Sequence, residues 1–76
     1  MVYGFHFELP GELIYYEGCK VEDEARTKLE KMAKEYCRNG KKGIGEILFM
    51  KNRKFEKISR YEYSFEDGEL IINELD

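Results

Sequence analysis

The chain has 76 residues, of which 42% are hydrophobic and 38% charged, and its formal net charge at pH 7 is −3. This length fits one domain over residues 1–76, and the six tyrosines and five phenylalanines argue against a disordered chain. The sequence has no apolar run near the ~18 residues of a membrane span, and no basic segment followed by an apolar stretch at its start. We therefore expect a cytoplasmic protein with no membrane span and no signal peptide.

The first residues alternate as a half-buried strand does. Over residues 2–9, one side of the predicted strand carries the apolar side chains of Tyr3, Phe5, Phe7 and Leu9. Pro10-Gly11 suits the centre of a type II turn, because proline presets φ and glycine accepts a positive φ. We expect a second strand over residues 13–16 that pairs back onto the first.

The next segment has the spacing of an amphipathic helix. Apolar side chains recur every three or four residues, at Val21, Ala25, Leu29, Met32, Ala33 and Tyr36. The acidic residues 22–24 suit the positive end of the helix dipole, and Asn39-Gly40 suits the C-cap. Such a helix would hold Cys19 and Cys37 ~25 Å apart, which excludes a disulfide bond between them.

The remaining residues read as three strands. We expect strands over residues 44–50, 54–65 and 70–75, with a break at Asn52-Arg53 and a hairpin turn at Asp67-Gly68. Lys57 and Ser59 interrupt the apolar side of the middle strand, so a bend or bulge is expected near them. Residues 44–58 would also fit a helical stripe, but Gly43, Gly45 and Asn52 favour strands.

These elements predict an α+β fold with the order ββαβββ, in which one helix packs on a mostly antiparallel sheet of about five strands. Such a sheet is over ~20 Å wide, whereas a helix is only ~10–12 Å across. One helix cannot cover the whole sheet, so we expect an apolar surface that a second copy or another protein buries, unless strong twist and long Lys and Tyr side chains cover it. The expected interface includes Ile47, Phe49, Tyr61 and Tyr63.

No complete catalytic or metal motif is present. Cys19 precedes the helix, where the dipole lowers a thiol pKa, but its activation also needs a base, and His6 is the only histidine. His6, Cys19 and Cys37 lack the paired short spacing of zinc ligands. The cluster of Glu66, Asp67 and Glu69 flanks a surface turn rather than a pocket. We therefore expect no enzyme, no metal and no cofactor.

One short string suggests nucleic-acid binding. Gly40-Lys41-Lys42-Gly43 resembles the GXXG loop of KH domains, which clamps a nucleic-acid backbone. The KH loop joins two helices, whereas a strand is expected to follow Gly43 here. A helix cap followed by a turn is the better interpretation.

Charge is distributed unevenly along the chain. Local net charges are −5 for residues 1–24, +3 for residues 25–40, +5 for residues 41–60 and −6 for residues 61–76. This asymmetry predicts an acidic or a basic contact surface, unless the last strand pairs beside the basic stretch and neutralises it.

We expect a small non-catalytic protein-binding module that inhibits or adapts a larger partner. In size and general composition it is similar to the small proteins by which phages and mobile elements block host defence enzymes, such as anti-CRISPR proteins. An acidic surface would suit a nucleic-acid-handling enzyme as partner, and a homodimer is also compatible. The expected partner-binding residues are Tyr61, Glu62, Tyr63, Glu66, Asp67, Glu69 and Glu74. The alternative is a nucleic-acid-binding domain that uses Lys51, Arg53, Lys54, Lys57 and Arg60, although the acidic net charge counts against it.

Overall fold

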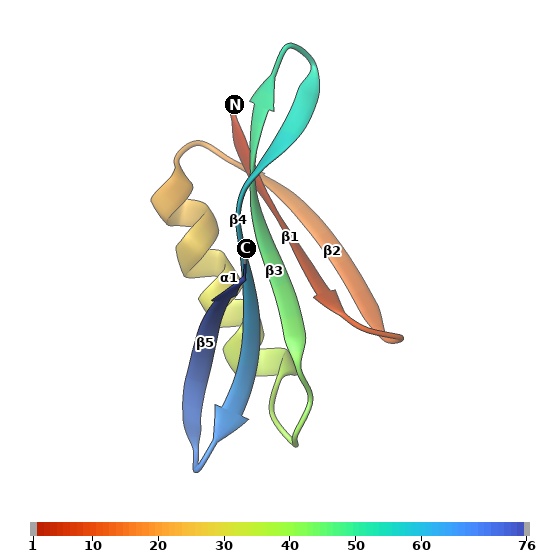
Figure 1. The fold of residues 1–76 in the computed structure, drawn as a ribbon, viewed down its shortest axis with the longest axis vertical. Coiled ribbons are helices and arrows are strands. Elements are labelled where there is room, and N and C mark those ends of the chain that lie inside the picture. The colour runs from red at the N-terminus through yellow and green to blue at the C-terminus, as the bar shows by residue number, and fades with distance from the viewer. Residues whose placement is uncertain (1, 76) are drawn as a thin grey trace.

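The computed structural model, which describes residues 2–75, contains five antiparallel strands in one sheet and one helix (Figure 1). Along the chain the elements are β1 (Tyr3–Leu9), β2 (Leu13–Cys19), α1 (Glu22–Tyr36), β3 (Gly43–Lys51), β4 (Lys54–Glu66) and β5 (Glu69–Leu75). In space the strands follow the order β2-β1-β3-β4-β5. The predicted α+β fold with the order ββαβββ is confirmed.

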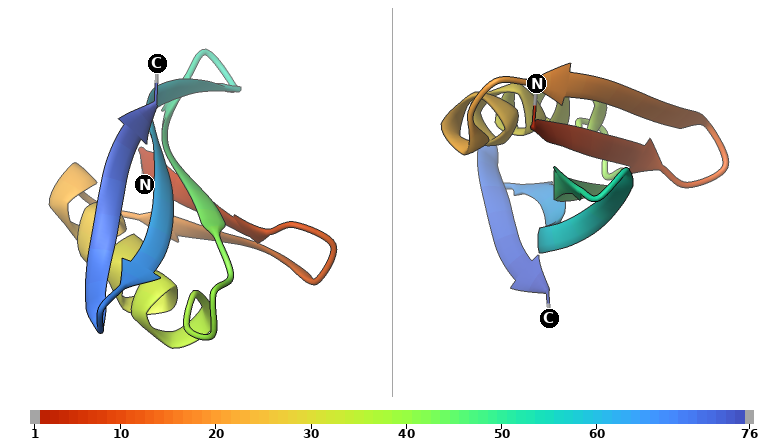
Figure 2. Two further views of the ribbon diagram at one scale, coloured as in Figure 1. Left: turned by 60° about the horizontal axis from the view of Figure 1, so that its bottom comes forward. Right: turned by 90° about the horizontal axis from the view of Figure 1, so that it is seen from above.

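The sheet is strongly twisted, so the β1–β2 hairpin and the β4–β5 hairpin diverge in direction (Figure 2). The molecule measures 42 × 24 × 21 Å. Its length comes largely from β4, whose 13 residues span roughly 40 Å when extended. The turn between β3 and β4 therefore lies at one end of the molecule and the turn between β4 and β5 at the other (Figure 1).

The core lies between α1 and the side of the sheet that carries the odd-numbered residues of β1, β2 and β3. Packing of α1 is mainly on β1, with further contacts to β3 and β2. Fully buried side chains from both layers meet here, among them Phe5, Phe7, Leu29, Cys37, Ile47 and Tyr63. The even-numbered residues of β1, β2 and β3 point to the other side of the sheet, which α1 does not cover and which we call the uncovered face.

Two glycines in β3 allow this close packing. A Cβ atom on Gly45 would lie 2.7 Å from Tyr63 Cε2 and 2.8 Å from Leu29 Cδ2. A Cβ atom on Gly43 would lie 2.7 Å from Phe7 Cζ and 2.8 Å from Cys37 Sγ. Gly43 thus serves the packing of the core, which explains it without the backbone-clamping role of a GXXG loop.

Two local expectations need adjustment, and a third is confirmed. The strand expected over residues 13–16 continues to Cys19 as part of β2. The helix ends before the expected cap: Cys37 is the C-cap residue, whereas Asn39 and Gly40 form a following turn with positive φ angles. The irregularity expected near Lys57 and Ser59 is present, because the β3–β4 register shifts between Ile47 and Leu48, opposite these residues.

Among residues 2–75, no helix is long and apolar enough to cross a membrane.

Two hairpins of the sheet turn through pairs of residues with positive φ. Asp67 and Gly68 have φ angles of 52° and 79°, and Asn52 and Arg53 have φ angles of 51° and 65°. Two-residue hairpin loops with both φ angles positive favour glycine at the second position, because a Cβ atom is strained in this conformation. Gly68 meets this preference and Arg53 does not.

We predict that Arg53→Gly raises the free energy of unfolding by up to about 1 kcal/mol by relieving this strain. The reciprocal change Gly68→Arg should lower it by a similar amount, since it introduces the same strain in the matching turn. Urea unfolding followed by circular dichroism measures both. A loss of stability in Arg53→Gly would mean that the Arg53 side chain makes a stabilising contact that outweighs the strain.

Candidate functional site

The outer edge of β2 is a free hydrogen-bonding edge. The Met50 N–H donates to the Val2 carbonyl over 2.7 Å, so even-numbered positions of β1 bond to β3. Because hydrogen-bonding direction alternates along a strand, the backbone N–H and C=O groups of the odd-numbered residues of β1 point toward β2. There they bond to the backbone of odd-numbered partners. The backbone N–H and C=O groups of Ile14, Tyr16 and Gly18 consequently point outward from the sheet.

The two edge strands differ in their protection against further pairing. Proteins commonly protect sheet edges with charged side chains or proline. β5 carries Glu69 and Glu74, whereas the seven residues of β2 carry one charge, Glu17, whose carboxylate is bonded to Lys28 on the helix side. β2 therefore presents an almost uncharged edge, with Tyr16 68% exposed and Ile14 60% exposed.

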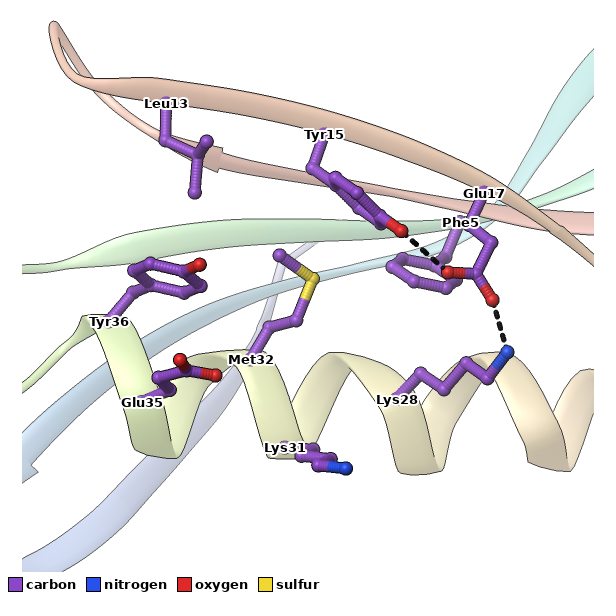
Figure 3. A pocket seen from close by; sticks show the side chains of 9 residues that line it. All are labelled: Phe5, Leu13, Tyr15, Glu17, Lys28, Lys31, Met32, Glu35 and Tyr36. Carbon is purple, nitrogen blue, oxygen red and sulfur yellow. Dashed lines mark hydrogen bonds and ion pairs between the residues drawn. The ribbon is translucent and has the colours of Figure 1, made fainter.

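A cleft of about 330 Å³ lies beside this edge, between β2 and α1 (Figure 3). Phe5 and Met32 project into its middle, and Leu13 and Tyr36 flank one end. Lys31 and Glu35 stand on the helix side of the opening. The cleft thus combines an apolar interior with charged groups at its rim, as peptide-binding grooves often do.

Glu17 organises the other end of the cleft. The Tyr15 hydroxyl donates to Glu17 Oε1 over 2.7 Å, and Lys28 Nζ donates to Glu17 Oε2 and lies 3.2 Å from Glu24 Oε2. Hydrogen bonds from Lys28 and Tyr15 hold the pKa of Glu17 below its usual value. The same carboxylate raises the pKa values of Lys28 and Tyr15. This network fixes the positions of Tyr15 and Lys28 relative to β2.

The uncovered face has one residue from every strand in its middle row. Tyr16, His6, Glu46, Arg60 and Leu75 are successive cross-strand partners. The His6 ring stacks on Tyr16 at a centroid distance of 4.7 Å, and His6 Nδ1 lies 3.4 Å from Glu46 Oε1. Glu46 Oε2 lies 3.6 Å from Arg60 Nε. Charge near the middle of this face is therefore balanced.

An apolar hollow lies beside the middle row. Gly4 and Gly18 are cross-strand partners, and with Leu48 they line a hollow of about 430 Å³ that Tyr16 and Phe55 also border. Phe55 is 54% exposed and its Cε1 atom would lie 3.7 Å from a Cβ atom on Gly4. The hollow exists because two adjacent strands lack side chains at this level.

The basic residues expected to bind nucleic acid lie together on the hairpin between β3 and β4. Lys51, Arg53, Lys54 and Lys57 are exposed, and within the described part of the chain none of them forms an ion pair. Arg60 lies lower on β4, beside Glu46. β5 pairs with residues 60–66 of β4, so it does not lie beside the basic tip and cannot neutralise it there. We call residues 51–60 the basic hairpin.

The acidic residues expected to bind a partner occupy the opposite end of the molecule. Glu66, Asp67 and Glu69 are exposed at the turn between β4 and β5, which we call the acidic turn. Glu62 lies on the uncovered face next to this turn, and the exposed Glu74 lies on β5, opposite Tyr61.

Tyr63 requires a correction. It was expected at the partner surface, but it is 1% exposed beneath α1, and burial raises the pKa of its hydroxyl. Ile47, also expected at an interface, is fully buried, and Phe49 lies on the same side of the sheet against Tyr3. All three have odd numbers and so face the helix, whereas the uncovered face belongs to the even-numbered side chains of β1 to β3. Tyr61 is partly buried against the core.

Neither cysteine meets a base. Cys19 and Cys37 are buried free thiols, and burial raises the pKa of both. His6 lies on the uncovered face and Cys19 on the helix side, so the sheet separates them. Within residues 2–75, no three histidine, cysteine or acidic side chains converge as metal ligands.

Sequence reasoning missed the edge of β2. The signal was the nearly uncharged run from Leu13 to Cys19, but only strand order shows that this run lies at an edge. The chain matches no protein-family model, no curated protein and no solved structure.

We predict that both thiols resist the thiol reagent DTNB in the native protein and react after unfolding in urea, since burial favours the unreactive protonated form. The melting temperature should be unchanged by a reductant. Fast reaction of either thiol in the native protein would show that it is accessible.

The Glu17–Lys28 pair predicts a pH dependence of stability. Because the pKa of Glu17 is depressed on folding, its contribution is complete above its ordinary value of 4.5 and is lost as the pH falls through the depressed value. Lys28→Met should therefore destabilise the protein at pH 7 and have little effect at about pH 2. Urea unfolding at the two pH values measures this. An equal effect at both would assign the loss to side-chain packing.

Proposed function

We propose that the chain is a non-catalytic protein-binding module that captures an extended segment of a larger partner along the free edge of β2. The single observation that carries this proposal is the outward-facing backbone of Ile14, Tyr16 and Gly18 next to the cleft against α1. Strand addition at a sheet edge draws its affinity from backbone hydrogen bonds and its specificity from alternate side chains.

The cleft defines the chemistry of the captured segment. Every second side chain of an added strand would point toward the helix side, where Leu13, Met32 and Tyr36 favour an apolar residue. Lys31 forms no ion pair within residues 2–75 and favours an acidic neighbour in the segment. The segment that fits best is thus extended, with apolar residues at alternate positions and a carboxylate beside them.

Inhibition or adaptation of the partner is the proposed outcome of binding. An acidic turn at the end of a narrow molecule can compete with nucleic acid for a basic surface, since charges of this kind steer association. A nucleic-acid-handling enzyme is therefore the proposed class of partner. This role is of the kind that small anti-defence proteins of phages and mobile elements, such as anti-CRISPR proteins, perform.

Nucleic-acid binding through the basic hairpin is the second candidate. The cations of its tip lack ion-pair partners within the described residues, and the exposed Phe55 offers a surface on which a base can stack. The remainder of the molecule is acidic and would repel phosphates, so this candidate ranks below protein binding. It predicts a dissociation constant that rises steeply with salt and depends on Lys51, Lys54 and Lys57.

We predict that selection from a displayed random peptide library yields peptides that bind along β2. Tyr16→Pro removes an outward-facing N–H group and breaks no hydrogen bond to β1. It should therefore lower the affinity for these peptides by about tenfold relative to Tyr16→Ala. Tyr16→Ala is the matched control, because it loses the same side chain and keeps the N–H group. Fluorescence polarisation with labelled peptides measures both affinities.

Equal affinity of the selected peptides for the two variants would contradict strand addition at β2. Circular dichroism of Tyr16→Pro checks that the sheet is intact. Since Tyr16 is largely exposed and β2 is an edge strand, the substitution is compatible with the fold.

A further inference from the structure

The uncovered face has a charge gradient along the length of the molecule. Glu8 and Glu62 lie one row from the middle row on the side of the acidic turn. Lys57 lies one row from it on the side of the basic hairpin. Beside the middle row this face is thus acidic toward the acidic turn and basic, at Lys57, toward the basic hairpin. Lys51 and Lys54 add positive charge at the tip of that hairpin, although their register places them on the helix side of the sheet.

Such a face is complementary to itself after a rotation that exchanges its ends. Consider two copies whose uncovered faces meet, with a two-fold axis between them that runs parallel to the middle row. Each strand then lies opposite the same strand of the other copy, and a row on one side of the middle row lies opposite the row equally far on its other side. Lys57 of one copy then lies opposite Glu62 of the other, because both are on β4 one row from Arg60. The basic hairpin of each copy reaches toward the acidic turn of the other, as an isologous interface requires.

The apolar side chains match under the same rotation. Ile14 and Gly18 lie on β2, one row on either side of Tyr16. Ile14 of one copy, 60% exposed in the single chain, therefore lies opposite the hollow at Gly18 of the other. Leu48 and Ile44 are related in the same way on β3. Ile14 thus faces a hollow and Leu48 faces another apolar residue.

We propose that two copies of the chain pack through their uncovered faces in antiparallel orientation, with the basic hairpin of each against the acidic turn of the other. A standard interface buries about 800 Å² per partner, and the uncovered face extends across the five strands of a molecule 42 Å long. Sheets packed in this way lie about 10 Å apart. The outer backbone edges of β2 remain free in this arrangement, so strand capture there does not depend on it, whereas the acidic turn can meet a basic partner only in the single chain.

The test reverses charge at each end separately. One variant carries Lys51→Glu, Lys54→Glu and Lys57→Glu, and the other carries Glu62→Lys, Glu66→Lys and Glu69→Lys. Each variant alone places like charges at both contacts of the dimer, whereas an equimolar mixture restores opposite charges at both. We expect the wild type to sediment as a dimer, each variant to dimerise about 100-fold more weakly, and the mixture to form a heterodimer close to wild-type affinity.

A matched control separates the local effect from that of net charge. Lys20→Glu, Lys31→Glu and Lys34→Glu change the net charge as much as the hairpin variant, at exposed positions that belong to neither the basic hairpin nor the acidic turn. This control should dimerise as the wild type does. A chain with both reversals should also dimerise with itself, because its two ends are again of opposite charge.

Several outcomes would overturn the inference. The first is a wild type that stays monomeric at about 100 µM, where a dimer with a dissociation constant of that order is well populated. The others are variants that dimerise as tightly as the wild type, and monomeric variants whose mixture stays monomeric. Binding of single-stranded oligonucleotides by a monomeric wild type, abolished in the hairpin variant, would identify nucleic acid as the ligand of the basic hairpin instead.

A covalent measurement keeps the test decisive if a charge variant unfolds. The double variant Arg53→Cys, Glu69→Cys places one thiol at each end of the molecule, too far apart for an intramolecular disulfide bond. The antiparallel arrangement predicts a disulfide-linked dimer under mild oxidation, with the wild type, whose native thiols are buried, as control. A product that remains monomeric would count against the arrangement.

Discussion

The close approach of α1 to β3 at Gly45 is the contact on which the rest of the structure depends. Without a Cβ atom at this position, Leu29 and Tyr63 pack directly over the strand. Gly43, two residues earlier in β3, likewise leaves room for Cys37 and Phe7 to pack over the strand. These contacts position the helix over β1 and β3, where it buries the aromatic side chains of the first strand. Because interiors pack as densely as crystals, a larger residue at either glycine would move the helix.

The position of the helix decides which surfaces remain available. Centred on β1 and β3, α1 leaves a cleft along β2, whose outer backbone groups stay unpaired. It also leaves the opposite side of the sheet without any covering layer. A domain of this size has little apolar burial to spare, so burying these surfaces against another chain stabilises the fold as well as the complex. The uncovered surfaces therefore follow from the ratio of one helix to five strands.

Charge adds direction to these apolar surfaces. The basic hairpin and the acidic turn lie at opposite ends because β4 runs almost the full length of the molecule. The short β5 pairs only with the distal part of β4, so its carboxylates do not reach the hairpin. The molecule is thus electrically polar along its length, and this polarity would orient a charged partner or a second copy.

The sequence by itself determined the local features of this protein. The two-residue alternation predicted β1, the three- and four-residue spacing predicted α1, and Asp67-Gly68 predicted the last turn. The interruption at Lys57 and Ser59 predicted the irregularity in β4. Each of these features depends on neighbouring residues, which steric and periodic rules relate directly to conformation.

Tertiary structure alone decided which surfaces are exposed. Strand order depends on the pairing of β1 with β3, about 40 positions apart, and no local pattern specifies such a partner. That pairing makes β2 an edge, and the sheet it builds places Tyr61, Tyr63 and Phe65 of β4 on the helix side. Tyr63 is therefore buried although its neighbours suggested a surface site, and Tyr16 is exposed although it looks like a core residue. Alternation assigns side chains to two sides of a strand, and only the position of the helix determines which side becomes the core.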